Sequence, residues 1–460
     1  MSSLVVGLII LILLLVLLAI GVPIAFALGL TSLISITLFL STSQLNSLGE
    51  TLFTELNNFT LLAIPLFIFM GAVFGGSKAS GDLFQAGQMW LGKVRGGLAM
   101  SSVVASGLFA ALCGASSATT AAIGRVAVPE MRQRGYSNGV ATGAVVAGGT
   151  LGILIPPSVT LILYGIATEQ SIGQLFLGGV IPGIIIIGMF CAWIFIAVSR
   201  ERRGGAVQGI VPHSGPSAQT EADGSSGTPM AEEDYPLKER LGALLKVIPF
   251  ILLIVAILFS LYGGYATPSE AAAVGAFLSL VMVIVYYHST LSWKKLVDIT
   301  LDATGTSTMV MMIVALSGVL GVTMSFLSIP QDLAQLISSL EINRWWIMLV
   351  INLFLLVLGF FLPPVSIILM VTPILYPIIT ALDFDPIWFG VLMTINMEMG
   401  LITPPVGLNL YVVKGIAPDV PLRDILMGSI PYVMVLALAI VLFCLFPGLI
   451  TWLPDKLFAG

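Results

Sequence analysis

The sequence predicts an all-α polytopic membrane protein made of two inverted repeats, each containing a re-entrant hairpin and a broken helix. Three observations lead to this prediction. Hydrophobic residues make up 58% of the 460 residues and charged residues only 9%, which is far from the balance of soluble proteins. Two apolar runs are interrupted by the proline pairs Pro156-Pro157 and Pro404-Pro405, and proline breaks a helix because it removes a backbone donor. The two pairs lie 248 positions apart, and other helix breakers recur at nearly the same spacing.

The first half of the chain, residues 1–200, contains elements that are defined by the length of their apolar windows. No basic residue precedes the first apolar run, so we interpret this run as a retained span rather than a signal peptide. We expect spans at Leu4–Ile20, Val22–Leu40 and Phe59–Phe74, an amphipathic helix at the membrane surface at Lys78–Leu91, a re-entrant hairpin at 96–134, a broken helix at 140–167 and a further span at Leu175–Val198.

Residues 201–240 differ in composition from everything around them. Gly, Pro and Ser supply 13 of the 26 residues from Gly204 to Pro229. Such a segment buries too little apolar surface to fold alone, and it predicts a disordered linker. The pattern then restarts in residues 241–460. We expect spans at Ala243–Leu261, Ser269–Tyr287 and Thr306–Leu327, an amphipathic segment at Asp332–Ile342, a hairpin at 346–379, a broken helix at 389–413 and a last span at Ile425–Phe446.

The helix breakers of the two halves correspond. Pro129, Gly152, Pro156 and Pro157 are each followed 248 positions later by the same residue type, at Pro377, Gly400, Pro404 and Pro405. If both hairpins enter and leave the bilayer on one side, each half crosses it five times. Since five is odd, the second half is inverted relative to the first.

The basic residues predict an orientation, because Lys and Arg concentrate on the cytoplasmic side of membrane proteins. With the N-terminus outside, 16 of the 18 Lys and Arg residues are cytoplasmic, and only Arg344 and Lys456 are not. We therefore expect both termini to be periplasmic and the linker at 201–240 to be cytoplasmic. If a hairpin were instead two full spans, its flanking loops would stay on the same side, and the number of cytoplasmic Lys and Arg residues would not change. This number therefore does not by itself establish that the hairpins are re-entrant.

Paired broken helices in inverted repeats are typical of secondary transporters that bind substrate near the bilayer midplane. Unwound carbonyls can coordinate a cation, and helix N-termini can bind an anion. The first hairpin carries a cluster of hydroxyl residues at its tip, Ser116, Ser117, Thr119 and Thr120. These residues fit such a site, but small residues also serve plain helix packing.

Glu398 is the acidic residue in the interior of a predicted span, and such a carboxylate is a candidate for function. Three interpretations of Glu398 stay open. It supports a second cation site, it couples transport to protons, or it is a structural group that is protonated or paired with the backbone. Two interpretations of Asn409 also stay open. Its side chain faces the substrate cavity between the repeats, or it packs in the bundle as a lone polar residue. Arg125 is better explained by extension of its side chain toward the cytoplasm than by substrate contact.

Several classes of function are not supported. A net charge of −5 gives no basis for nucleic-acid binding. Two histidines cannot form a histidine metal cluster, and no P-loop motif for ATP occurs. The three cysteines lie in apolar segments and predict no disulfide framework. A membrane-embedded enzyme would need a second ionisable residue beside Glu398, so we do not predict an enzyme. A channel remains an alternative to a carrier.

Seven stretches carry a family resemblance that covers nearly the whole chain outside the linker. They are FTLLAIPLFIFMGAVF (59–74), GASSATTAAIGRVAVPEM (114–131), GGTLGILIPPSV (148–159), GQLFLGGVIPG (173–183), TPSEAAAVGA (267–276), FLPPVSIILMVTPILYP (361–377) and GLITPPVGLNLYV (400–412). With these stretches the sequence resembles the large membrane subunit of tripartite ATP-independent periplasmic (TRAP) transporters.

The resemblance implies an elevator-type fold in a bacterial inner membrane and sodium-driven uptake of an organic acid, without ATP. It also implies two partners, a small four-helix membrane subunit and a periplasmic substrate-binding protein. A self-sufficient sodium/carboxylate symporter of related fold is the alternative. Which acid is carried, a C4-dicarboxylate, a keto acid or a sugar acid, stays open.

The resemblance also implies site residues. One sodium ion would be bound by Gly114, Gly152, Ile155 and Pro157, and a second by Pro364, Ser366, Gly400, Thr403 and Pro405. The substrate would lie between the hairpin tips, near Ser116, Ser117 and Ser366. Thr119 of the hydroxyl cluster and the polar Asn409 are further candidates for contact with it.

Overall fold

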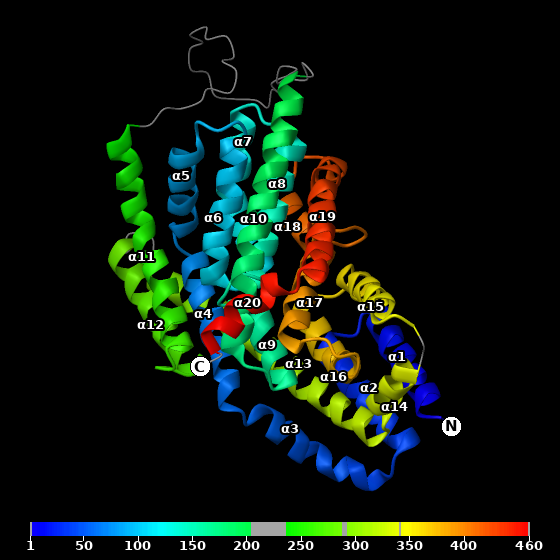
Figure 1. Ribbon diagram of the computed structural model, residues 1–460. Helices are drawn as coiled ribbons and strands as arrows, with labels where there is room; N and C mark the ends of the chain where they lie inside the picture. The colour runs from blue at the N-terminus through cyan, green and yellow to red at the C-terminus, as the bar shows by residue number, and fades with distance from the viewer. Residues whose placement is uncertain (1, 204–235, 288–291, 340–341, 459–460) are drawn as a thin grey trace.

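The chain is a bundle of helices whose order is the same in its two halves (Figure 1). The computed structural model describes residues 2–203, 236–287, 292–339 and 342–458. The first half contains α1 (Ser3–Ala19), α2 (Ile24–Phe39), η1 (Thr42–Ser47), α3 (Leu48–Leu56), η2 (Phe59–Leu62), α4 (Ala63–Gly75), α5 (Ala79–Leu91), α6 (Gly97–Cys113), α7 (Ser116–Gln133), α8 (Asn138–Thr150), η3 (Leu151–Ile153), α9 (Val159–Thr168) and α10 (Ile172–Arg203).

The second half repeats this order with one long helix in place of the first half's α3 and α4. It contains α11 (Leu237–Tyr262), α12 (Pro268–Tyr287), α13 (Trp293–Phe326), α14 (Ile329–Ser339), α15 (Arg344–Gly359), α16 (Pro364–Ala381), α17 (Pro386–Leu401), α18 (Leu408–Ile416), α19 (Leu422–Leu445) and a terminal α20 (Gly448–Phe458).

Local sequence explains where many helices begin. The side chains of Ser137, Ser158, Asn343 and Asp385 each accept a hydrogen bond from a backbone N–H in the first turn of the helix that follows. Such caps satisfy donors that a helix start leaves unpaired. Pro364 and Pro386 occupy the first helical position, where the missing N–H of proline costs nothing.

Packing between the halves is reciprocal. Helix α4 packs on α12 and α2 packs on α13, while α5 packs on α11 and α1 packs on α14. In the same way α7 packs on α18 and α9 on α16, and α8 packs on α19 and α10 on α17. Each contact has a counterpart with the halves exchanged, as a two-fold relation between the repeats requires.

The two hairpins open toward opposite ends of α10. A Cβ on Gly96, at the open end of the α6–α7 hairpin, would lie 2.9 Å from Ile194 in the C-terminal part of α10. The open end of the α15–α16 hairpin lies beside the start of α10, because the Gln170 amide donates to the Tyr376 hydroxyl (3.0 Å). A helix of 32 residues is about 48 Å long. The repeats are therefore inverted.

Both hairpins end halfway along a broken helix. The tip after α6 contacts Gly152 and Pro157, which lie in the middle of the α8–η3–α9 element. The end of α15 contacts Gly400, where α17 stops and α18 has not yet begun. Both hairpins thus turn back at mid-depth, as re-entrant hairpins do.

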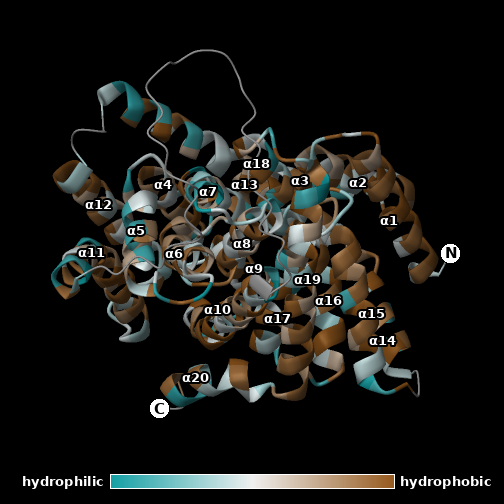
Figure 2. Cartoon of the chain, turned by 90° about the horizontal axis from the view of Figure 1, so that it is seen from above, coloured by the Kyte–Doolittle hydropathy of each residue, from teal (hydrophilic) through white to brown (hydrophobic). Residues whose placement is uncertain are grey.

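Hydrophobic residues predominate in most of the helices, and α1, α2 and α15 along one side consist largely of such residues (Figure 2). Within the described residues, six helices are long and apolar enough to cross a membrane, and they are α10, α11, α12, α13, α16 and α19. Helices α1 and α2 are apolar but shorter. The α3 and α4 regions form one further apolar pair, bent by 58°.

Several boundaries differ from the sequence predictions. Helices η1 and α3 were not predicted, because Gln44, Asn46, Glu50 and Glu55 lower the hydropathy of that stretch. The segment expected at the membrane surface, Lys78–Leu91, forms α5 and buries Leu83 and Phe84 against protein, since α5 packs on α6 and α11. Helix α10 continues to Arg203 and α11 starts at Leu237, so the ends of the predicted linker 201–240 are helical. Residues 204–235 lie outside the described residues.

Candidate functional site

The tip of the first hairpin lies against the break of the first broken helix. Gly114 ends α6 with a φ of 61°, a left-handed conformation that glycine adopts without strain. A Cβ on Gly152 would lie 2.8 Å from the carbonyl oxygen of Ala115, and a Cβ on Gly114 would lie 3.4 Å from that of Pro157. The structure therefore brings Gly114, Gly152 and Pro157 together at backbone contact.

Local bonds shape this first break. The Ser158 hydroxyl donates to the carbonyl of Ile153 (2.5 Å) and accepts from the N–H of Leu161 in the first turn of α9. The Ile155 side chain packs against Gly107 of α6 and Gly183 of α10. Only the backbone of Ile155 is therefore free to take part in a site at the break.

The second hairpin tip and the second break meet in the same way. A Cβ on Gly400 would lie 2.6 Å from the Cα of Gly359, at the end of α15. Thr403 follows in the break, and its hydroxyl donates to the carbonyl of Met399 (2.5 Å). The hydroxyl oxygen keeps lone pairs that a cation can use. Pro404 and Pro405 are exposed, whereas Pro364, which begins α16, is buried.

A buried hydrogen bond joins the two repeats at the site. The Asn409 amide, in the first turn of α18, donates to the hydroxyl of Ser116 at the start of α7 (2.7 Å). The amide oxygen of Asn409 has no partner within the described chain, and neither has the fully buried hydroxyl of Ser366 at the start of α16. These two unpaired groups are candidates for a bound polar ligand, because buried polar groups are normally hydrogen-bonded.

The other hydroxyls of the first tip behave differently from one another. The hydroxyls of Thr119 and Thr120 donate back to the carbonyls of Ala115 and Ser116, both at 2.9 Å. Ser117 is partly exposed and lies next to the exposed Ala118. Of these side chains Ser117 is the one that reaches the surface, and a substrate role for Thr119 stays a prediction.

Glu398 is fully buried in α17, two residues before Gly400. Neither of its carboxyl oxygens has a hydrogen-bond partner within the described chain. No group of three His, Cys, Asp or Glu side chains gathers anywhere in that part of the chain. A cation at the tips would therefore be bound by backbone carbonyls and hydroxyls.

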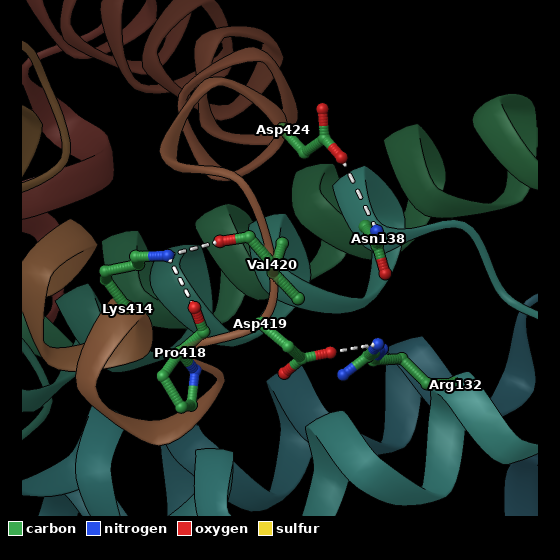
Figure 3. A network of polar contacts seen from close by, with 7 residues as sticks. All are labelled: Arg132, Asn138, Lys414, Pro418, Asp419, Val420 and Asp424. Atoms are coloured by element: carbon green, nitrogen blue, oxygen red, sulfur yellow. Dashed lines mark hydrogen bonds and ion pairs between the residues drawn. The ribbon is translucent and has the colours of Figure 1, made fainter. Parts of the chain in front are cut away.

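Polar contacts join the open end of the first hairpin to the loop between α18 and α19, and the start of α8 to the start of α19 (Figure 3). Arg132 pairs with Asp419 (2.6 Å), Lys414 donates to the carbonyls of Pro418 and Val420 (both 2.7 Å), and the amide of Asn138 donates to Asp424 (3.4 Å). The hydrogen bond from Arg132 lowers the pKa of Asp419. These contacts could not be predicted from the sequence, because a charged residue at a helix end does not indicate which distant residue it pairs with.

The match to a family model decides the identity of this membrane protein. Residues 11–449 match the model of the tripartite ATP-independent periplasmic transporter, DctM component. The chain belongs to the DctM family. It is therefore the large permease component of a TRAP transporter, as the resemblance in the sequence predicted.

Known TRAP transporter permease proteins align with most of this chain. The C4-dicarboxylate TRAP transporter large permease protein of Pseudomonas aeruginosa is 36% identical over 94% of this chain and 94% of its own length. The sialic acid TRAP transporter large permease protein of Vibrio cholerae is 30% identical, and the alignment covers 96% of both chains. The isethionate TRAP transporter permease protein DctMQ of Oleidesulfovibrio alaskensis is 33% identical over 86% of this chain but only 58% of its own length.

A solved structure shares the fold. The YdaH transporter of Alcanivorax borkumensis superposes with a TM-score of 0.62 over 89% of this chain and 90% of its own, at 14% identity. At this identity the likeness supports the fold alone. It agrees with the predicted all-helical fold class.

Proposed function

We propose that this DctM-family chain is the permease of a sodium-coupled TRAP transporter that imports an organic acid across a bacterial inner membrane. The observation that carries the proposal is the meeting of two hairpin tips with two helix breaks at mid-depth. Breaks of this kind free backbone carbonyls for a cation and helix N-termini for an anion.

The first sodium site would use backbone groups at Gly114, Gly152, Ile155 and Pro157. The second would use Pro364, Ser366, Gly400, Thr403 and Pro405. The contact between the first tip and the first break supports the first set. For the second set the support is the unpaired hydroxyl of Ser366 together with the position of Thr403 in the break.

The substrate would bind between the tips, near Ser116, Ser117, Thr119, Ser366 and Asn409. The N-terminus of α7 begins at Ser116, and helix N-termini attract carboxylates. Named relatives carry C4-dicarboxylates, sialic acid and isethionate, all of which are acids. We therefore propose a small organic acid as the substrate class.

Two partners complete the proposal, a small four-helix membrane subunit and a periplasmic binding protein that delivers the acid. The isethionate TRAP transporter permease protein DctMQ extends well beyond the 58% of its length that aligns with this chain, which supports a second membrane component that works with the permease. In an elevator mechanism, the hairpins and broken helices would move as one body against the remaining helices. The termini would be periplasmic and the segment between α10 and α11 cytoplasmic.

Reconstitution tests this proposal. Proteoliposomes containing the chain and its small membrane subunit are given a sodium gradient, the binding protein and a labelled acid. Uptake that needs all three components and collapses without the sodium gradient is expected. Uptake by this chain alone, without either partner, would instead favour a self-sufficient sodium/carboxylate symporter.

A further inference from the structure

The first helix of the second hairpin is held by few neighbours. Helix α15 lies at the edge of the bundle (Figures 1 and 2) and packs mainly on α17 and α16. Its outward side carries large exposed apolar side chains, Leu349, Val350, Leu353 and Val357. Because lipid is as apolar as these side chains, apolar burial alone does not fix the position of α15, and close approach and hydrogen bonds between helices must do so.

A buried amide joins α15 to α17. Asn396 of α17 is 1% exposed, and its Nδ2 donates both to the backbone carbonyl of Asn352 (2.9 Å) and to the side-chain Oδ1 of Asn352 (3.0 Å). The Nδ2 of Asn352 donates to the carbonyl of Met348 in its own helix (2.8 Å), which leaves its Oδ1 for Asn396. An amide buried without hydrogen bonds is costly, so the two bonds to Asn352 stabilise this pairing of the helices.

The same two helices also meet at the tip of the hairpin. A Cβ on Gly359 of α15 would lie 3.2 Å from the Cα of Gly400 of α17. Gly359 follows Asn352 by seven residues and Gly400 follows Asn396 by four, so on each helix both contacts lie on one face. A slide of α15 by one residue, about 1.5 Å, would stretch the bonds of Asn396 beyond the roughly 3.2 Å that hydrogen bonds allow. The amide therefore fixes the register in which the two glycines meet.

The first repeat uses close packing at the corresponding position. The offset of 248 residues that relates Gly400 to Gly152 relates Asn396 to Gly148 of α8. A Cβ on Gly148 would lie 2.7 Å from the Oγ of Ser106 in α6, so an amide has no room there. Helix α6 is surrounded by α4, α5, α7, α8, α10 and α11, and this packing positions it. The hydrogen-bonded amide thus occurs in the repeat whose hairpin has fewer neighbours.

Register matters because the proposed second sodium site combines groups from the hairpin and from the break. Ser366 lies in the first turn of α16, whereas Gly400 lies near the end of α17 and Thr403 follows it in the break. Ligands from two elements surround one cation only if supporting hydrogen bonds and packing hold the elements at a fixed distance. We propose that Asn396 is a positioning residue, which holds the second hairpin on α17 through Asn352 and thereby assembles the second sodium site.

Hydrogen exchange of the full chain in lipid nanodiscs tests the hold on the hairpin, and it requires neither sodium nor transport. Asn396→Leu keeps the branched shape of the side chain but removes its donors. Backbone amides of residues 355–361, around the second tip, should then exchange about tenfold faster, while those of residues 110–116 at the first tip should not change. The matched control is Thr394→Val, which removes a buried hydrogen bond within α17, from the Thr394 hydroxyl to the carbonyl of Gly390 (2.9 Å), and should leave the second tip unchanged.

Sodium activation of uptake tests the positioning role, and it rests on the proposed function. In proteoliposomes with the complete transporter, Asn396→Leu should raise the sodium concentration for half-maximal uptake about tenfold and leave the rate at saturating sodium near that of the wild type. A merely structural loss would instead lower the maximal rate and leave the half-maximal sodium concentration unchanged. Asn352→Leu keeps the backbone carbonyl as an acceptor, so it should give a smaller rise, about threefold. Thr394→Val should behave as the wild type.

The two measurements separate the possible outcomes. Unchanged exchange at the second tip of Asn396→Leu would overturn the hold on the hairpin, and faster exchange with an unchanged sodium requirement would overturn the positioning role. An equal rise in Thr394→Val would also overturn that role, because the effect would then come from α17 as a whole. If Asn396→Leu does not fold, Asn352→Leu decides by the same measurements. Wild-type uptake without any sodium dependence would contradict the proposed function and the positioning role together, whereas the exchange result would still show whether Asn396 holds the hairpin.

Discussion

The two helix breaks share a backbone design but lie in different surroundings. From Gly152 to Ser158 the first break is buried except for a partly exposed Ile155, whereas Pro404, Pro405 and Val406 of the second break are exposed. The first helix of each hairpin shows the same difference in burial. In α6, 15 of the 17 residues are buried, whereas in α15 only 5 of the 16 residues are buried. The first break therefore lies inside the bundle, whereas Pro404 to Val406 of the second break lie at its surface.

The proposed first site is therefore enclosed by protein, while the proposed second site combines the buried Pro364, Ser366 and Gly400 with the partly exposed Thr403 and the exposed Pro405. Packing holds the first tip from several sides, through α8, α10 and α18. At the second tip a Cβ on Gly400 would lie 2.6 Å from the Cα of Gly359, and α16 packs on α9, α13 and α14. Substitutions in the buried first break should therefore reduce uptake more than equivalent substitutions in the partly exposed second break.

The largest effect is expected from Gly152→Val. Its Cβ would lie 2.8 Å from the backbone of Ala115, so the tip and the break must separate. Overpacking of a buried contact costs about 1–3 kcal/mol, and sodium-driven uptake should fall about tenfold or more. Gly188→Val is the control, because nothing lies within 4 Å of a Cβ there. If Gly400→Val reduced uptake more than Gly152→Val, the contrast between the sites would be wrong.

The next effect is expected at the bond between the repeats. Asn409→Ala removes the donor to the Ser116 hydroxyl (2.7 Å) and should lower the free energy of unfolding by about 1–3 kcal/mol, because it leaves a buried group unpaired. Denaturant unfolding in micelles measures this. A double-mutant cycle with Ser116→Ala should give a coupling energy, while one with the partly exposed Ser117→Ala should give none. Additive effects in both cycles would contradict the bond.

A smaller effect is expected from Thr403→Ala in the exposed break. The variant removes a candidate hydroxyl ligand, and a single hydrogen-bond-like contact contributes about 1 kcal/mol. The sodium concentration for half-maximal uptake should therefore rise about fivefold. Thr403→Ser keeps the hydroxyl and should behave as the wild type. Unchanged sodium activation in Thr403→Ala would remove Thr403 from the site.

The smallest effect is expected from Asp419→Asn at the outer end of the first hairpin. Arg132 donates a hydrogen bond to Asp419 and so lowers its pKa below the ordinary 3.8. A lowered pKa means that the pair stabilises the fold at neutral pH, and that this contribution is lost as the pH falls through that lowered pKa. The Asp419 side chain is 60% exposed, so the change should be slight. The thermal unfolding midpoints of the wild type and Asp419→Asn, compared at neutral and at acid pH, measure this change. A large decrease of the midpoint at neutral pH would show that the Arg132–Asp419 pair stabilises more than the loop between α18 and α19.

The sequence predicted those features that depend on local backbone chemistry. The doubled prolines Pro156-Pro157 and Pro404-Pro405 lie at helix breaks, so the breaks could be predicted without a structure. The single prolines Pro129 and Pro377, also taken as helix breakers, lie inside α7 and α16. The contacts of Gly152 and Gly400 with the tips follow from the family resemblance rather than from the residues themselves. The distances between the hairpin tips and the breaks could be obtained only from the three-dimensional structure.

Contacts between distant residues could not be predicted. Ser116 and Asn409 are 293 positions apart, and Arg132 and Asp419 are 287 apart. A lone Asn in an apolar run has the same appearance in sequence whether it packs against a neighbour or binds a ligand. Helix α3 was missed for a related reason, because an amphipathic segment of nine residues gives a weak apolar signal.

The reciprocal packing of the repeats has a consequence for biosynthesis. Helix α4 leaves the ribosome long before α12, on which it packs, and α7 waits still longer for α18. The first half therefore enters the bilayer with its partner surfaces unoccupied, and the insertion machinery or lipid must shelter them until translation ends. Two polypeptides divided between α10 and α11 should be unstable apart and assemble when they are made together.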